Sequence, residues 1–148
     1  MKRNEDLANR LRAVLLDGRW IANTNYKEQL EGLHWALATQ KIADLNTIAA
    51  LTFHITYYME GVLQVLRGGP LEIRDKYSFD VPEINSQKEW DTLIDRFLDF
   101  SRQFTQCLEQ MDPALLDAVF VDEKYGSYER NITGIIEHSY YHLGKWSY

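Results

Sequence analysis

The sequence predicts an all-α fold, a four-helix bundle with a long crossover and short connecting helices. Apolar residues recur at helical spacing along four long segments, and capping residues or glycines mark several of the ends. Residues 71–85 lack a clear period, contain Pro82 and separate the second long segment from the third, as a crossover connection would. A chain of 148 residues can bury one core, so we expect a single domain over residues 1–148.

The first expected helix carries Leu7, Leu11 and Leu15 on one face and ends near Gly18. Asn25, with Glu28 three residues later, forms the pattern of a capping box and opens a short connecting helix. The first bundle helix is therefore followed by a connector and not by a second long helix.

The second long helix is expected from about Asn46 to Arg67, with Asn46 or Thr47 as its cap, because Gly-Gly-Pro follows it at 68–70. Its inward-facing residues are expected to be Leu51, His54, Tyr58, Gly61 and Val65.

The third long helix is expected to begin after Ser86, which forms a second capping-box pattern with Glu89. Its apolar stripe is Trp90, Leu93, Ile94, Phe97, Phe104, Cys107, Leu108 and Met111. Asp112 followed by Pro113 predicts a break and then a short helical turn through Asp117.

Residues 119–128 alternate weakly between apolar and polar, which fits a short strand or an extended loop, and we favour the loop. We expect Asn131 to cap the last helix. This helix carries Ile132, Ile135, His138 and His142 along one side.

Two histidines of the last helix, His138 and His142, lie four residues apart and therefore on one face. His54 lies on the otherwise apolar stripe of the second long helix. Three imidazoles from two facing helices can hold a transition metal and leave one position open to water or substrate. Imidazole nitrogen favours zinc, nickel, copper or iron over magnesium or calcium, and we expect zinc or nickel.

Two other metal chemistries fit the residues poorly. Ser139 follows His138 where a zincin protease would carry its general-base glutamate. A di-iron carboxylate bundle needs two Glu-x-x-His motifs, and only Glu31 with His34 matches, in the connector; we expect His34 to be a surface or structural residue.

Spacing does not select the residues that support the histidines. Glu137, Tyr58, Tyr128 and Asp122 are each candidates, and Tyr58 is the best expected pocket-lining residue because it follows His54 by one helical turn.

Charge and composition exclude several kinds of partner. The formal net charge of -6 and the absence of a long Lys/Arg run disfavour nucleic acid and anionic membranes, so we expect a small-molecule substrate. The single cysteine, Cys107, excludes an intrachain disulfide and fits a reducing compartment. With no secretory-type apolar run near the start and no long apolar stretch, we expect a cytoplasmic protein.

Four sequence stretches resemble the DinB-like (DNA-damage-inducible, YfiT-type) superfamily of bacterial four-helix bundles over nearly the whole chain. They are Gly18-Arg19-Trp20, Leu30-Glu31-Gly32-Leu33, the run from Leu45 to Ile55 that contains His54, and the run from Ile135 to Gly144 that contains His138 and His142. The resemblance implies a divalent metal, commonly nickel or zinc, held by His54, His138 and His142, and a homodimer. Some members of the family are transferases or isomerases that use a low-molecular-weight thiol such as bacillithiol, mycothiol or glutathione.

These observations lead to two expectations of function. The first is a metal-dependent transferase or hydrolase with its metal on the three histidines, and a thiol-dependent transferase is one version of it. The alternative is a non-catalytic stress-related or ligand-binding bundle, in which the histidine site is structural or vestigial.

Overall fold

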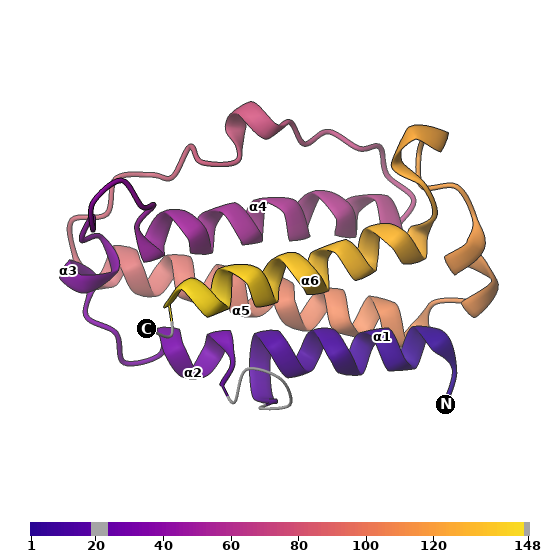
Figure 1. Ribbon diagram of the computed structural model, residues 1–148, viewed down its shortest axis with the longest axis horizontal. Coiled ribbons are helices and arrows are strands. Elements are labelled where there is room, and N and C mark those ends of the chain that lie inside the picture. Colours follow the sequence, from indigo (N-terminus) through magenta and orange to yellow (C-terminus); the bar gives the residue numbers. More distant parts are fainter. Residues whose placement is uncertain (19–23, 147–148) are drawn as a thin grey trace.

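Four long helices lie side by side in the computed structural model, which describes residues 1–18 and 24–146 (Figure 1). They are α1 (Arg3–Arg12), which continues into the π-helical turn η1 (Ala13–Asp17), α4 (Ile48–Leu66), α5 (Gln87–Gln110) and α6 (Tyr128–Trp146). The short elements are α2 (Tyr26–Leu30), α3 (Trp35–Ala38), η2 (Asp75–Tyr77), η3 (Pro113–Asp117) and η4 (Glu123–Tyr125). The predicted all-α bundle is therefore confirmed.

Helix α5 packs against both α1 and α4, and α6 also contacts both of them. The long connection from α4 to α5 runs along the outer side of α4 (Figure 1). None of the helices in the described part of the chain is long and apolar enough to cross a membrane. The crossover and α6 are the elements that flank α4 where His54 lies.

Most helix starts follow the predicted capping residues. The side-chain oxygen of Asn25 accepts a hydrogen bond from the N–H of Glu28 at 2.8 Å, and Thr47 accepts one from Ala50 at 3.0 Å. Ser86 accepts from Glu89 at 3.2 Å. These caps satisfy N–H groups that have no partner inside the helix, which is why short polar side chains mark the starts so clearly.

The predicted cap at Asn131 is wrong. Helix α6 already begins at Tyr128, and Oγ of Ser127 accepts a hydrogen bond from the N–H of Arg130 at 3.1 Å. Asn131 lies one turn further on, and its Nδ2 donates to the carbonyls of Tyr125 and Ser127, both at 2.8 Å. Asn131 therefore binds the segment that enters the helix instead of capping the helix itself.

The segment before α6 is a loop, as we favoured, and an isolated antiparallel bridge between Val119 and Ser127 closes it. Inside the loop η4 ends at Gly126, which has a φ of 78°. We call residues 118–128 the clip. Residues 71–85 also form a loop, interrupted only by η2.

The core lies between the long helices and is filled by large side chains from every one of them. Leu11, Leu15, Met59, Phe97 and Ile132 are fully or almost fully buried. Cys107, a residue of the predicted apolar stripe, lies half-buried at the edge of this core. Trp35 is also partly buried against the core, whereas Arg19 and Trp20 lie outside the described residues.

Tyr26 joins three helices through one fully buried side chain. Its ring stacks on Phe97 of α5 with centroids 5.5 Å apart, and its hydroxyl donates to the carbonyl of Ser139 in α6 at 2.6 Å. Burial raises the pKa of Tyr26 well above its usual value, so the hydroxyl remains a proton donor. This contact fixes α6 at the residue between the two histidines of that helix.

We predict that Tyr26→Phe lowers the free energy of unfolding by about 1–2 kcal/mol, because it leaves the buried Ser139 carbonyl without that donor. Urea unfolding followed by circular dichroism measures the change. Tyr77→Phe, at a ring that is 46% exposed, is the matched control and should leave the unfolding midpoint unchanged. Equal midpoints for all three proteins would contradict the prediction.

Candidate metal centre

Three histidines converge between α4 and α6. His54 comes from the middle of α4, and His138 and His142 come from successive turns of α6. One nitrogen from each ring lies within 4.8 Å of the other two. The Nε2 atoms of His138 and His142 are 2.7 Å apart, and the His54 ring centroid lies 5.2 Å and 5.5 Å from the other two centroids. The fold thus brings His54 to the pair, as the inward stripe of α4 indicated.

The donor set fits a tetrahedral transition metal. Two imidazole nitrogens bound to one zinc ion at 2.0–2.1 Å lie about 3.3 Å apart in tetrahedral geometry. The observed separations, 2.7 Å for His138 and His142 and at most 4.8 Å within the group, bracket this value. The distance of 2.7 Å is that of a hydrogen bond between the two rings, so both Nε2 atoms are directed into the same space.

Burial favours the neutral, metal-binding form of the His54 imidazole. His54 is 7% exposed and His142 is 6% exposed. Burial, with a smaller contribution from the charge of His138, lowers the pKa of His54, and the backbone of Ser78 and the charge of Asp75 oppose this shift. Nδ1 of His54 is buried without a well-formed hydrogen bond, with the Ser78 backbone beside it. A backbone carbonyl in that place orients a metal-binding ring.

Two aromatic rings enclose His54. Phe79, from the crossover, stacks face to face on the imidazole with centroids 4.1 Å apart and planes 6° apart. Tyr58 meets the imidazole edge-on at 5.0 Å, and its hydroxyl donates to the carboxylate of Asp75. Burial and this hydrogen bond raise the pKa of Tyr58 to about 12, so its phenol stays neutral. Tyr58 therefore supplies a neutral hydroxyl beside the histidines.

Three of the predicted supporting residues are not at the site. Glu137 is exposed and lines a separate groove against α1. The Tyr128 ring packs against Phe120 at 5.2 Å, and Asp122 caps η4 by accepting from the N–H of Lys124 at 3.0 Å. His34 is exposed, as expected, and its Nδ1 accepts from the N–H of Ala36 at 3.2 Å.

Sequence reasoning missed the residues that the crossover contributes. Asp75, Ser78 and Phe79 lie in the aperiodic segment, where spacing says nothing about which side chain faces the bundle. The one available signal was the length of this segment beside a histidine-bearing helix.

A cavity of about 860 Å³ opens beside His54 and His138. Helices α4 and α6, the first part of the crossover and the clip form its walls. Its apolar lining includes Val62, Leu71, Ile73, Phe120 and Ile135. A volume of this order suits a small organic molecule.

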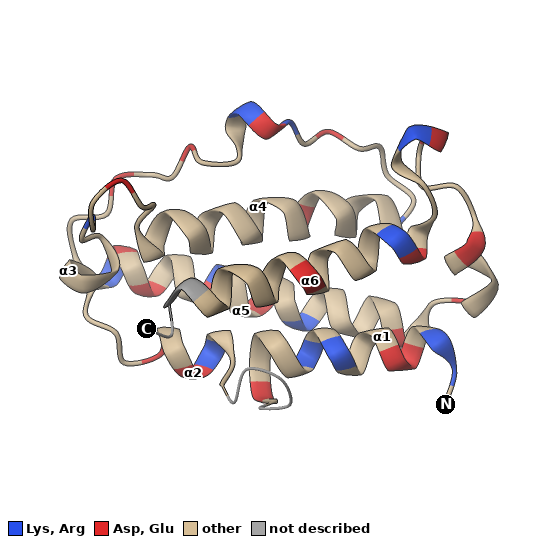
Figure 2. Ribbon diagram, in the orientation of Figure 1, with Lys and Arg blue, Asp and Glu red and all other residues tan. Residues whose placement is uncertain are grey.

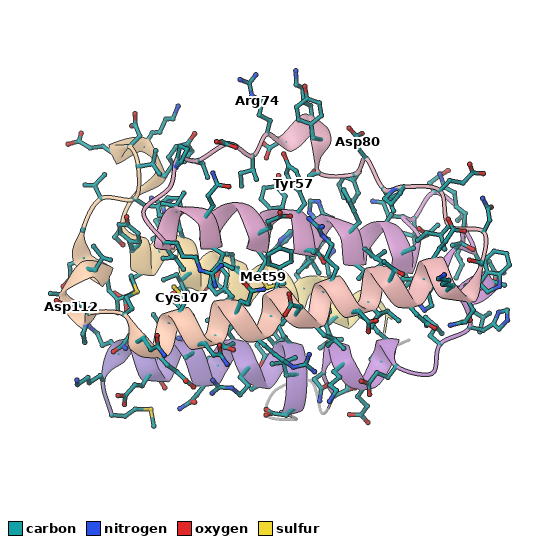
Figure 3. All side chains as sticks on the ribbon, turned by 180° about the vertical axis from the view of Figure 1, so that it is seen from behind. Tyr57, Met59, Arg74, Asp80, Cys107 and Asp112 are labelled. Carbon is teal, nitrogen blue, oxygen red and sulfur yellow. The ribbon has the colours of Figure 1, made fainter. Side chains whose placement is uncertain are left out.

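The crossover is fastened to α4 at two adjacent places. A Cβ atom at Gly61 would overlap Cγ2 of Ile73, so glycine at this position admits the isoleucine side chain. The Tyr57 hydroxyl accepts from the N–H of Arg74 at 2.7 Å and donates to its carbonyl at 3.1 Å. Figure 3 shows Tyr57 between α4 and the crossover and the Arg74 side chain directed away from the bundle. The backbone at Arg74 is therefore held at the rim of the cavity.

The fold and the site together define a four-helix bundle with a three-histidine centre between its second and fourth long helices. The family model described as the DinB superfamily matches residues 24–145. The chain belongs to the DinB superfamily, and the resemblance found in its motifs is confirmed. Neither a comparison with curated proteins nor one with solved structures gives a significant match.

We predict that Tyr57→Phe speeds amide exchange at Arg74 by about tenfold, because it removes the acceptor of that N–H. Hydrogen exchange followed by NMR or mass spectrometry measures it. Amides in the middle of α5 serve as the internal reference and should be unaffected. Unchanged exchange at Arg74 would show that the hydroxyl does not hold the crossover.

Proposed function

We propose that the protein is a metal-dependent enzyme of the transferase or hydrolase class, with nickel or zinc bound by His54, His138 and His142. The observation that carries this proposal is the convergence of three imidazole nitrogens, with the rings of His54 and His138 lining a cavity large enough for a substrate. Membership of the DinB superfamily is compatible with it.

The described residues leave room in such a site for a reacting group. No cysteine or carboxylate among them joins the three histidines. A metal held by three histidines would lower the pKa of a water or thiol and polarise a substrate oxygen. The protein's own contribution is to bury His54, which lowers the pKa of its imidazole, to cover this ring with Phe79, and to place the neutral phenol ring of Tyr58 edge-on beside it.

Any thiol used in the reaction would have to come from a cosubstrate. Cys107 is the only cysteine of the sequence, and it lies on α5 and does not line the cavity. Burial raises its pKa, so its thiol is held in the protonated, unreactive form. We therefore include a low-molecular-weight thiol as the proposed cosubstrate of a transferase. The expected homodimer and the cytoplasmic location are parts of the same proposal.

We predict that the purified protein carries about one nickel or zinc ion per chain, and that His54→Ala, His138→Ala and His142→Ala each reduce metal content at least about tenfold. Elemental analysis after dialysis measures the content. His34→Ala is the matched control, because His34 is exposed and caps α3, and it should keep the metal. Wild-type protein that takes up no transition metal would refute the proposal.

Catalysis is separated from a purely structural site by assaying the same variants. Thiol addition to an aryl halide and hydrolysis of an aryl ester are suitable general assays. An activity that His34→Ala retains and the other three variants lose, with the fold intact by circular dichroism, supports an enzyme. Metal binding without any histidine-dependent turnover would instead favour the non-catalytic, ligand-binding bundle.

We predict that the metal is released as the pH falls, because imidazoles must be neutral to bind it. A lowered pKa means that His54 stays neutral to a lower pH than an ordinary histidine of pKa 6.5, so half-release should fall below pH 6.5. Titration with a chelator and a colorimetric metal indicator measures the midpoint. Metal retained throughout the acid range in the presence of chelator would contradict ligation by histidine.

A further inference from the structure

One face of α6 carries Arg130, Gly134 and His138 at intervals of four residues, and all three line the cavity. At 1.5 Å per residue, Arg130 and His138 are separated by about 12 Å along the helix. The cavity is therefore elongated along α6, with a guanidinium at one end, the histidines at the other and a glycine between them.

Gly134 keeps the middle of this cavity open. Glycine inside a helix is less favourable than alanine, so it is usually explained by close packing. Here packing gives no explanation, because a Cβ atom at Gly134 would meet nothing within 4 Å. Since Gly134 lines the cavity, a side chain at this position would project into the space that a ligand would occupy.

Arg130 is held at the far end of the cavity without an acidic partner. Among the described residues no carboxylate lies within ion-pair distance of its guanidinium, whereas neighbouring Glu129 pairs with Arg3. The side chain lies across Gly126, where a Cβ atom would be 2.7 Å from Cδ of Arg130. The φ of 78° at Gly126 already requires glycine, so the clip both makes the turn and leaves room for the arginine.

Two basic residues, Lys124 and Arg130, line this end of the cavity on an acidic protein. The chain has a formal net charge of -6, yet Lys124 lines the cavity beside Arg130. Figure 2 shows a basic residue next to an acidic one on both η4 and the first turns of α6, and neither Glu123 nor Glu129 lines the cavity. Among the described residues that line the cavity, Asp75 is the only acidic one, and its carboxylate accepts from Tyr58 at the opposite, histidine end. The remaining basic residue of the lining, Arg74, points away from the bundle (Figure 3).

We infer that the cavity binds an elongated substrate with an anionic group, a carboxylate or a phosphate, paired with Arg130 and Lys124. The apolar middle of the substrate lies over Gly134 between Val62, Ile73 and Ile135. Its other end reaches the histidines. Only one part of this inference, that the substrate reacts at the histidine end, rests on the proposed function.

The test uses octanoate and octyl phosphate as anionic probes and octanamide as the neutral probe of equal chain length. Calorimetric titration of the purified protein, with and without prior chelation, compares wild type with Arg130→Gln, Gly134→Val and Arg74→Gln. Arg74→Gln is the matched control, because it removes an equal charge from the same lining at a side chain that is directed away from the bundle. Comparison of the two anions shows which head group the site prefers.

We expect wild type to bind at least one anion more tightly than octanamide. Arg130→Gln should weaken anion binding by about three- to tenfold. This loss is larger than that of a surface ion pair and smaller than that of an enclosed charge-assisted hydrogen bond, because Arg130 is exposed but lines the cavity. Gly134→Val should abolish binding of all three probes while leaving metal content unchanged. Arg74→Gln should change affinity by less than about twofold.

Two results would overturn the inference. One is equal affinity for octanamide and both anions. The other is anion binding that disappears on chelation and is unaffected by Arg130→Gln, because the anion would then lie at the histidines. Arg130-dependent binding in a protein that takes up no metal would instead support the cavity while refuting the metal-dependent enzyme, so the two failures are distinguishable.

Discussion

The hydrogen bond from Tyr26 to the Ser139 carbonyl is the contact on which the histidine site depends. Ser139 lies between His138 and His142 in sequence, and at 3.6 residues per turn it lies about 60–100° around α6 from them, so a partner there fixes the rotation of the helix about its axis. Because the Tyr26 ring also stacks on Phe97, α5 serves as the reference for that rotation. The histidine face is thereby directed at α4 by a contact on the adjacent face of the helix.

The crossover completes the site from the other direction. Gly61 and Tyr57 fasten it to the same helix that supplies His54, so the imidazole and its cover move as one unit. Phe79 then shields the ring from water on one face, while the other side opens into the cavity. A polar substrate that enters the cavity therefore meets a buried imidazole that is not already hydrogen-bonded to bulk water.

Capping residues and helical spacing predicted the helices, whereas contacts between segments that are distant in the sequence were not predicted by such local patterns. Ser86 predicted the start of α5 because a capping side chain binds an N–H group of the first helical turn. The spacing of His138 and His142 is also a local property of the sequence. The failure at Asn131 arose because Ser127 and Asn131 are both polar residues that suit a helix start, and only the path of the clip distinguishes them. The stacking of Phe79 on His54 had no signal in sequence, because an irregular loop has no period from which side-chain direction follows.

Because the histidines lie far apart along the chain, metal binding would also affect the stability of the fold. His54 and His138 are more than eighty residues apart, so the donor set exists only after the two halves of the bundle have docked. A metal held by them would act as a reversible cross-link that binds the native state alone. Each tenfold rise in free metal above its dissociation constant would then add about 1.4 kcal/mol to native-state stability. The folded fraction of this protein would in that way follow the metal supply of the cell.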